Sequence, residues 1–197
     1  MRILKFSYKL YNFVLFFKFV EVVNKKFIRY ILLSNEPQKR RFFWERLGIL
    51  SKVLITRGKG RWIWIHANSI GEVNASQVIV ELIKDKYRKT QILLTTTNFS
   101  ADERASQLNG ADAVLFFPYD VPFIIKKLLR IFKPACIIIV ECDIWPNFVK
   151  ICKDQSIPVL VVSGVYTNNA SRSLALRHLY NFTFRLSEEV LKNVDYY

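Results

Sequence analysis

A loop of short polar residues that ends in a carboxylate follows the first buried apolar run of this sequence. The run covers residues 62–67 and is followed by Asn68, Ser69, Gly71 and Glu72. Gly71 suits a tight turn. The carboxylate of Glu72 would open the next helix, where it could be a first-turn acid favoured by the helix dipole or a general base in a ligand crevice. Position alone leaves both interpretations open.

A second pair of carboxylates follows another apolar run. Glu141 and Asp143 come after residues 136–140 and precede a Trp145-Pro146 helix start, a place where proline is well accommodated. If the strand continues through them, their spacing sends both side chains to the same side. Burying acids at the end of a core strand is costly, which favours a role in binding a ligand or in hydrogen bonding. Two carboxylates without a nearby histidine are a weak metal signature, and no metal is expected.

Other polar residues near the ends of apolar runs are weaker candidates. Residues 95–98 could offer hydroxyl groups to a ligand or cap a helix, and residues 118–120 are expected to form a turn and an N-cap. His66 is expected to be a core histidine with its hydrogen bonds satisfied, and His178 a surface residue.

The spacing of apolar residues predicts the elements that must position these groups. Short apolar runs of the kind found in parallel strands cover residues 62–67, 91–97, 113–117, 135–140 and 158–162. Helical spacing covers residues 73–87, 102–108, 120–132 and 148–153, with Val78, Leu82 and Ile83 on one face of the first. This alternation predicts an α/β fold, a Rossmann-like doubly wound parallel sheet, with ligands beyond the carboxyl ends of its strands. Neither the G-x-G-x-x-G nor the G-x-x-x-x-G-K-[ST] phosphate-binding motif is present.

The basic charge of the chain is concentrated near its N-terminus. The 197 residues have a net charge of +14, and residues 1–61 hold 15 of the 30 Lys and Arg but only three of the 16 acids. A nucleic-acid-binding domain would spread basic residues over its folded face, so nucleic acid is not an expected partner. With 51% hydrophobic residues the chain is not intrinsically disordered. Three cysteines without C-x-x-C spacing indicate a reducing compartment.

The predicted organisation is a membrane-associated segment over 1–35, a basic linker and lead-in over 36–61, and a globular domain over 62–197. The first segment is rich in large apolar residues, but its longest uncharged stretch, 10–17, is well short of the ~20 residues of a transmembrane helix. Its polar residues lie on two opposite helical faces, which predicts a break near 16–18 or deep insertion with snorkelling lysines. The alternative is a helix that docks on its own domain. Together the basic and aromatic residues favour an anionic membrane surface as partner.

Several motifs taken together resemble the 3-deoxy-D-manno-octulosonic acid (Kdo) transferases. The similarity covers about residues 40–197, and its motifs agree with those of the family in residue identity, order and spacing. They lie at residues 45–48, 64–73, 95–97, 117–120 and 141–147.

The resemblance implies the N-terminal half of a GT-B glycosyltransferase at the cytoplasmic face of the inner membrane. Such an enzyme moves Kdo from the donor CMP-Kdo, without a cofactor, to the lipid A precursor lipid IVA. By this resemblance Glu72 is the general base. Asn68, Ser69, Gly71, Glu141 and Asp143 bind substrate on the acceptor side.

The sequence also departs from the family pattern. Asp143 stands where the family usually carries Glu, and residues 163–167 replace an Asn-Ala-Arg-like run. Family members are longer, and their C-terminal domain supplies most of the donor site. The chain is therefore expected to lack the donor half and to transfer little sugar unless a separate C-terminal domain chain complements it. The alternative is a non-catalytic membrane-bound Rossmann-like domain that acts through a partner chain.

Overall fold

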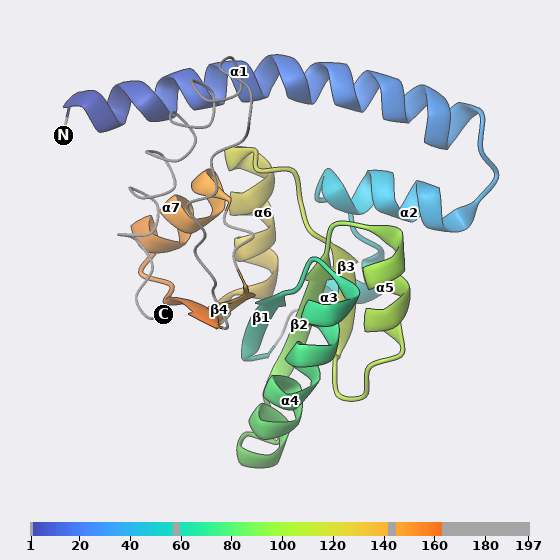
Figure 1. Cartoon of the computed structure of the whole chain (residues 1–197), viewed down its shortest axis with the longest axis vertical. Helices are drawn as coiled ribbons and strands as arrows, with labels where there is room; N and C mark the ends of the chain where they lie inside the picture. The colour runs from blue at the N-terminus through green and yellow to red at the C-terminus, as the bar shows by residue number, and fades with distance from the viewer. Residues whose placement is uncertain (1, 57–59, 142–144, 163–197) are drawn as a thin grey trace, which may run out of the picture.

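The computed structural model describes residues 2–56, 60–141 and 145–162, with an α/β fold built on one parallel sheet (Figure 1). The five strands lie in the order β3-β2-β1-β4-β5. Their bounds are β1 (Trp62–His66), β2 (Gln91–Thr96), β3 (Ala113–Phe116), β4 (Pro134–Val140) and β5 (Val159–Val162). The predicted Rossmann-like sheet is confirmed, and each strand lies within one residue of its predicted run.

Helices cover both faces of this sheet. Helices α4 (Ile70–Lys86) and α5 (Phe99–Ser106) pack on one face, and α6 (Pro122–Phe132) and α7 (Pro146–Asp154) pack on the other. Right-handed crossovers require this division, because the chain moves from β1 towards β3 and then returns to β4 and β5. The direction reverses between β1 and β4, and this pair of strands forms the switch point where doubly wound sheets bind ligands.

The first strand shows how alternation fills the two halves of the core. Trp62 and Trp64 point towards α6 and α7, and the ring of Trp64 meets Phe148 edge-on at 5.1 Å. Ile65 points to the opposite side, towards α4 and α5. Because apolar residues fill both faces, the strand is a continuous apolar run in the sequence.

Helix α4 buries a different face from the predicted one. Val78 and Leu82 are 59% and 66% exposed, whereas Val73, Ser76 and Val80 are buried. Of the three residues predicted to share one face, Ile83 packs against the core, whereas Val78 and Leu82 do not. Val73 and Val80 are seven residues apart and contact the sheet together. The hydroxyl of the small Ser76 between them donates a hydrogen bond to the Val73 carbonyl oxygen. Apolar spacing could not separate the two faces, because both carry valine or leucine.

The N-terminal segment is one long helix that leads into a π-helical turn. Helix α1 (Arg2–Lys26) continues directly into η1 (Phe27–Leu32), so the predicted break near 16–18 is wrong. One face of α1 packs on the domain through Tyr8, Tyr11 and Phe19. The alternative of a helix docked on its own domain is thus what the structure shows for this face. No helix in the described part of the chain combines the length and apolarity needed to cross a membrane.

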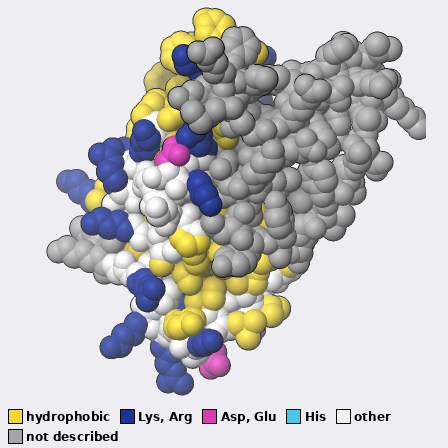
Figure 2. All heavy atoms as spheres, turned by 90° about the vertical axis from the view of Figure 1, so that its left-hand side faces the viewer, with side chains coloured by type: hydrophobic (Ala, Val, Ile, Leu, Met, Phe, Trp, Pro, Cys, Tyr) yellow, Lys and Arg dark blue, Asp and Glu magenta, His cyan; other side chains and the backbone are white. Residues whose placement is uncertain are grey.

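The opposite face of α1 carries an aromatic ridge, defined here as Phe13, Phe16 and Phe17. These side chains are 63%, 60% and 59% exposed. Figure 1 shows α1 running along the outside of the domain past α7, α6 and α2. Figure 2 views the side where α1 begins, and basic side chains there lie beside apolar ones with few acids between them.

Residues 37–46 form a packed helix and not the predicted linker. Helix α2 (Pro37–Arg46) buries Phe42 and Phe43, and the short helix α3 (Lys52–Thr56) follows it. The aromatic pair explains the difference, because Phe42 packs edge-on against Phe116 of β3 at 4.8 Å. Gly48 ends α2 with a φ of +69°, a left-handed conformation that glycine adopts without strain.

Candidate functional site

The loop after β1 lies at the switch point of the sheet. It joins β1 to α4, and the segment after β4 lies beside it because β1 and β4 are paired. The predicted residues Asn68, Ser69, Gly71 and Glu72 therefore share one edge of the sheet with Glu141. Asp143 lies outside the described residues.

Glu72 is held in a reciprocal hydrogen-bond pair at the start of α4. Its backbone N–H donates to Ser69 Oγ at 3.1 Å, and its Oε2 accepts from the Asn68 N–H at 2.7 Å. This arrangement resembles a capping box, but the carboxylate accepts from the N–H of Asn68 and not from that of the N-cap residue, Ser69. The side chain is only 7% exposed. Its second oxygen, Oε1, has no hydrogen-bond partner among the described residues.

The geometry combines the two interpretations that the sequence left open for Glu72. The carboxylate does cap the helix, and the cap holds it in one orientation at the switch point. A carboxylate with one oxygen anchored and the other unpartnered can accept a proton from a ligand hydroxyl. The arrangement is thus compatible with a general base.

Asn68 connects the loop after β1 to the end of β2. Its Oδ1 accepts from Thr97 Oγ1, and its carbonyl oxygen accepts from the side-chain amide of Asn98. Asn98 also caps α5 through the Ala101 N–H at 2.9 Å. The polar residues at the end of β2 therefore act mainly as supports for the loop that carries Glu72.

Ser69 and Gly71 are exposed, and the expected turn at Gly71 is absent. Gly71 lies in the first turn of α4, and a Cβ added there would meet only Ser69 Oγ at an ordinary 3.7 Å. The polypeptide turns at the extended N-cap residue, Ser69, whose φ is −115°. Gly71 therefore leaves the helix start bare, where a side chain would otherwise project.

Glu141 differs from its prediction in both conformation and exposure. Strand β4 ends at Val140, and Glu141 has a φ of +63° with an exposed side chain. The strand does not continue through Glu141, so the premise that placed Glu141 and Asp143 on one side is wrong. The Glu141 N–H pairs with the Val162 carbonyl at 2.8 Å, which ends the β4 ladder. An exposed acid at the switch point is still positioned to contact a ligand.

Aromatic rings form the floor between the ends of β1, β3 and β4. His66 is buried, its Nδ1 lies 3.0 Å from the Thr95 carbonyl oxygen, and its ring lies 4.1 Å from that of Phe117. Phe117 also stacks on Trp145 at 5.7 Å. His66 is thus the satisfied core histidine that was predicted. The free thiols Cys136 and Cys152 lie away from this floor, on β4 and α7.

A buried carboxylate that the sequence did not reveal joins three distant segments. Asp120 was expected to cap its own helix, but its Oδ1 accepts from the Phe148 N–H at 2.8 Å and its Oδ2 accepts from the Asn147 N–H at 2.9 Å and from Tyr11 at 2.8 Å. It therefore caps α7 and tethers α1. Asn147 adds a second link by donating to Asn12 Oδ1 at 2.7 Å. These four residues with Phe148 form what we call the polar node.

Local sequence patterns could not find the polar node, because Tyr11 and Asp120 are 109 residues apart. A weak signal was present in the N-terminus of α7, which begins with Trp-Pro-Asn and has no N-cap side chain of its own. Such a helix needs an acceptor from elsewhere. Burial raises the pKa of Asp120 to about 7, against the opposing effect of its hydrogen-bond donors.

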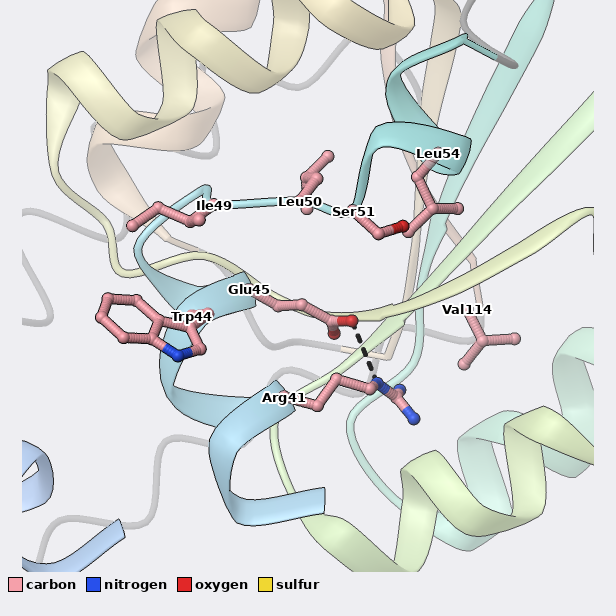
Figure 3. Close-up of a pocket in the computed structure, with 8 residues that line it drawn as sticks. All are labelled: Arg41, Trp44, Glu45, Ile49, Leu50, Ser51, Leu54 and Val114. Carbon is pink, nitrogen blue, oxygen red and sulfur yellow. Dashed lines mark hydrogen bonds and ion pairs between the residues drawn. The ribbon is translucent and has the colours of Figure 1, made fainter. Parts of the chain in front are cut away.

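A second buried acid lies beside the edge strand β3. Glu45 Oε2 accepts from the Phe116 N–H at 2.9 Å, and Oε1 accepts from Arg41 Nε at 3.0 Å. Arg41 also pairs with Asp102 of α5. Figure 3 shows Glu45 and Arg41 in a groove of about 620 Å³ whose other lining residues are mostly apolar. This groove runs beside Val114 of β3, so it is separate from the Glu72 loop at β1.

Burial of these acids predicts that the fold loses stability as the pH rises. Burial raises the pKa of Glu45 from 4.5 to about 7, although Arg41 lowers it. Between these values the native state holds a proton that the unfolded state has released, so the free energy of unfolding falls as the pH rises through 7. We expect the melting temperature to fall between about pH 5 and about pH 8. Glu45→Gln should flatten this slope without abolishing it, because Asp120 acts in the same direction.

The control for this pH effect is Asp154→Asn. Asp154 is exposed and pairs with Lys150 on the surface of α7. Calorimetry of the three proteins across the pH range measures the slopes. A Glu45→Gln slope as steep as that of the unchanged protein would contradict the assignment.

No group of three or more His, Cys, Asp or Glu side chains suited to a metal is found within residues 2–56, 60–141 and 145–162. The described donors around Glu72 are one carboxylate, amides and hydroxyls.

Comparison with known proteins places residues 41–195 in one family. This segment matches the family model described as 3-deoxy-D-manno-octulosonic-acid transferase (kdotransferase). A 3-deoxy-D-manno-octulosonic acid transferase of Haemophilus influenzae is 29% identical over 136 residues, which are 68% of this chain and 31% of the relative. A probable mitochondrial 3-deoxy-D-manno-octulosonic acid transferase of Arabidopsis thaliana is 36% identical over 116 residues, 58% of this chain and 25% of the relative.

The chain thus spans about a quarter to a third of the length of the curated relatives it matches. Among solved structures, the S. aureus MnaA-UDP co-structure overlaps 57% of this chain and 30% of its own, at 17% identity and a TM-score of 0.41.

Proposed function

The chain belongs to the 3-deoxy-D-manno-octulosonic-acid transferase family, and we propose that it forms the acceptor side of an inverting glycosyltransferase. The donor is CMP-Kdo and the acceptor is the lipid A precursor lipid IVA, at the cytoplasmic face of the inner membrane. A donor-binding domain, on the same or a separate chain, completes the site. The observation that carries this proposal is the anchored carboxylate of Glu72 at the switch point.

In the proposed reaction Glu72 acts as general base. Its Oε1 accepts the proton of an acceptor hydroxyl while that oxygen attacks the anomeric carbon of Kdo. The bond from this carbon to the CMP phosphate oxygen breaks, and CMP leaves with the bonding electron pair. Attack opposite to the leaving group inverts the anomeric centre in one displacement.

The residues around Glu72 have positioning roles in this proposal. Asn68 fixes the carboxylate through its N–H, and Ser69 fixes the first turn of α4. The bare helix start at Gly71 leaves room for a sugar ring to approach. Exposed Glu141, on the other side of the switch point, can accept hydrogen bonds from acceptor hydroxyls. We assign Asp143 to the same side by resemblance to the family.

The placement of α1 supports a membrane-bound acceptor. Its docked face contacts Tyr119 and Asp120, which follow β3, and Asn147, which opens α7. All three lie at the carboxyl edge of the sheet, the edge that carries Glu72. The aromatic ridge therefore faces outward from the side of the domain where the candidate base lies, and an interfacial helix with basic flanks suits an anionic membrane.

A transfer assay tests the proposed reaction. The chain, supplied with a donor-binding domain of the family, is incubated with CMP-Kdo and lipid IVA, and the lipid product is measured by mass spectrometry. We expect the lipid to gain Kdo and CMP to be released in equal amount. A folded, completed protein that releases no CMP and forms no product would reject the proposal.

Vesicle binding tests the role of the aromatic ridge. Replacing Phe13, Phe16 and Phe17 by serine should weaken binding to anionic vesicles by roughly 100-fold or more, because each buried aromatic contributes about 1.5–3 kcal/mol. Co-sedimentation measures the change. The matched control replaces Val78 and Leu82 of α4, which are equally exposed. An equal loss in both variants would show that the ridge is not the membrane contact.

A further inference from the structure

A groove at the amino edge of the sheet is lined mainly by cations. It has a volume of about 420 Å³ and lies where α4 ends and where β1 and β2 begin. We call it the basic groove, and its charged and aromatic lining residues are Arg61, Asp85, Lys86, Tyr87, Arg88 and Lys89. Four of these six residues carry a positive charge and one carries a negative charge, so the groove attracts anions.

The four cations of the basic groove lack an anionic partner among the described residues. All four side chains are exposed, and within 2–56, 60–141 and 145–162 none of them forms an ion pair. Asp85 lines the same groove without pairing with any of the four. By contrast, the exposed Lys150 of α7 pairs with Asp154 at 2.6 Å. Uncompensated cations that share one concavity are an arrangement that an external anion would stabilise.

The turn that carries these cations is held from both sides. Lys84 Nζ donates to the Thr90 carbonyl oxygen at 2.9 Å. The Thr90 N–H closes the turn by donating to the Tyr87 carbonyl oxygen at 2.9 Å. On the other side, the Gln91 N–H donates to the Arg61 carbonyl oxygen at 2.9 Å. The cations are therefore displayed on a fixed backbone, so a partner does not have to order this turn when it binds.

The basic groove lies at the opposite end of the domain from the aromatic ridge. Figure 1 shows α4 running away from α1, so its last turn lies at the far end of the molecule. The 17 residues of α4 place this end about 25 Å from the Glu72 loop. Figure 2 shows basic side chains gathered at the same lower end. A membrane in contact with the ridge would not reach the groove, so we expect the anion to come from solution.

An acidic polypeptide fits the basic groove better than a nucleic acid does. Asp85 lies among the cations, and it would repel a backbone that carries a phosphate at every nucleotide. A polypeptide can direct its carboxylates at the cations and an uncharged or basic residue at Asp85. Tyr87 of the same lining is 53% exposed, and tyrosine and arginine are enriched among the residues that anchor protein interfaces.

We propose that the basic groove is a docking site for an acidic segment of a partner protein. The carboxylates of that segment pair with the four cations, and the partner is held on the side of the domain that faces away from α1. Binding of this kind needs no covalent step and no sugar donor, so it is independent of the proposed transferase activity.

A photoreactive acidic peptide tests this docking site. Full-length protein is titrated with a fluorescent peptide of alternating glutamate and serine that carries a benzophenone group, and cross-linked fragments are identified by mass spectrometry. We expect saturable binding and cross-links to residues 84–91. Lys86→Gln combined with Arg88→Gln and Lys89→Gln should weaken binding by about tenfold, because three exposed ion pairs are lost. A melting curve checks that this variant keeps its fold.

The matched control removes the same charges from another helix. Lys126, Lys127 and Arg130 are exposed on α6 and form no ion pair in the part of the chain that the structure describes. Their combined replacement by glutamine should weaken binding by no more than about twofold, because salt screens distant surface charges. An equal loss in the two variants would show that net charge alone drives binding, and the site is then rejected. Cross-links to α1 in place of residues 84–91 would reject it as well.

A single-stranded oligonucleotide with the same net charge as the peptide distinguishes the two classes of partner. We expect the groove variant to weaken oligonucleotide binding no more than the α6 variant does. Asp85→Asn should tighten oligonucleotide binding, because it removes a repelling carboxylate. A larger loss for the oligonucleotide than for the peptide in the groove variant would assign the groove to nucleic acid and overturn the proposal. Neither arm contains CMP-Kdo, so failure here is distinct from failure of the transfer assay.

Discussion

Replacing Glu72 by glutamine is expected to lower Kdo transfer by about 10²- to 10⁴-fold, the usual contribution of a general base. The loss should appear in kcat, because an amide cannot take the acceptor proton. The fold should survive, since the glutamine carbonyl can accept the Asn68 N–H as Glu72 Oε2 does. Capping boxes accept either residue. Initial rates in the transfer assay, with a melting curve of each protein, separate the chemical effect from the structural one.

The control for this substitution is Glu81→Gln on the outer face of the same helix. Glu81 accepts from Gln77 at the surface and lies far along α4 from the loop. It should retain full activity. A Glu72→Gln enzyme within a few-fold of normal activity would assign Glu72 a capping role only, and the base would have to be sought elsewhere on this edge.

Replacing Asp120 by alanine is expected to cause the largest loss of stability. The change leaves the N–H groups of Asn147 and Phe148 and the hydroxyl of Tyr11 without their acceptor. Unsatisfied buried groups cost about 1–3 kcal/mol each, so the free energy of unfolding should fall by about 3–5 kcal/mol. Urea denaturation followed by tryptophan fluorescence measures it.

Two further variants locate this loss. Tyr11→Phe removes only the hydrogen bond between α1 and Asp120 and should cost about 1 kcal/mol. Asp154→Ala, at the exposed end of α7, should change stability little. If Asp120→Ala costs no more than Asp154→Ala, the polar node does not support the fold.

The polar node and the capping box show which features of the site local sequence can predict. The loop that carries Ser69 and Glu72 follows the first apolar run directly, and its hydrogen bonds close within one turn, so local sequence was enough to locate it. Asp120 was assigned to the wrong helix. Its partners belong to α1 and α7, and nothing in residues 118–120 distinguishes a carboxylate that caps its own helix from one that reaches another.

The predictions for Glu141 and for residues 37–46 were wrong for a related reason. The strand was extended through Glu141 because five apolar residues precede it, but the chain leaves the ladder at Val140 with a left-handed residue. Residues 37–46 were assigned to a linker because of their charge. The buried rings of Phe42 and Phe43 outweigh that charge, because Phe42 packs against Phe116 of β3 and burial of two aromatic side chains stabilises the helix on the domain.

The sequence by itself determined the order of the five strands and of the helices between them, their bounds to within a few residues, and the loop that carries Glu72. These features depend on periodicity and on contacts between near neighbours, which the order of residues encodes directly. Only the tertiary structure decided which face of α1 docks and which helix Asp120 caps. Such contacts join residues far apart in the chain, so they exist only once the parallel sheet has brought the carboxyl ends of its strands to one edge.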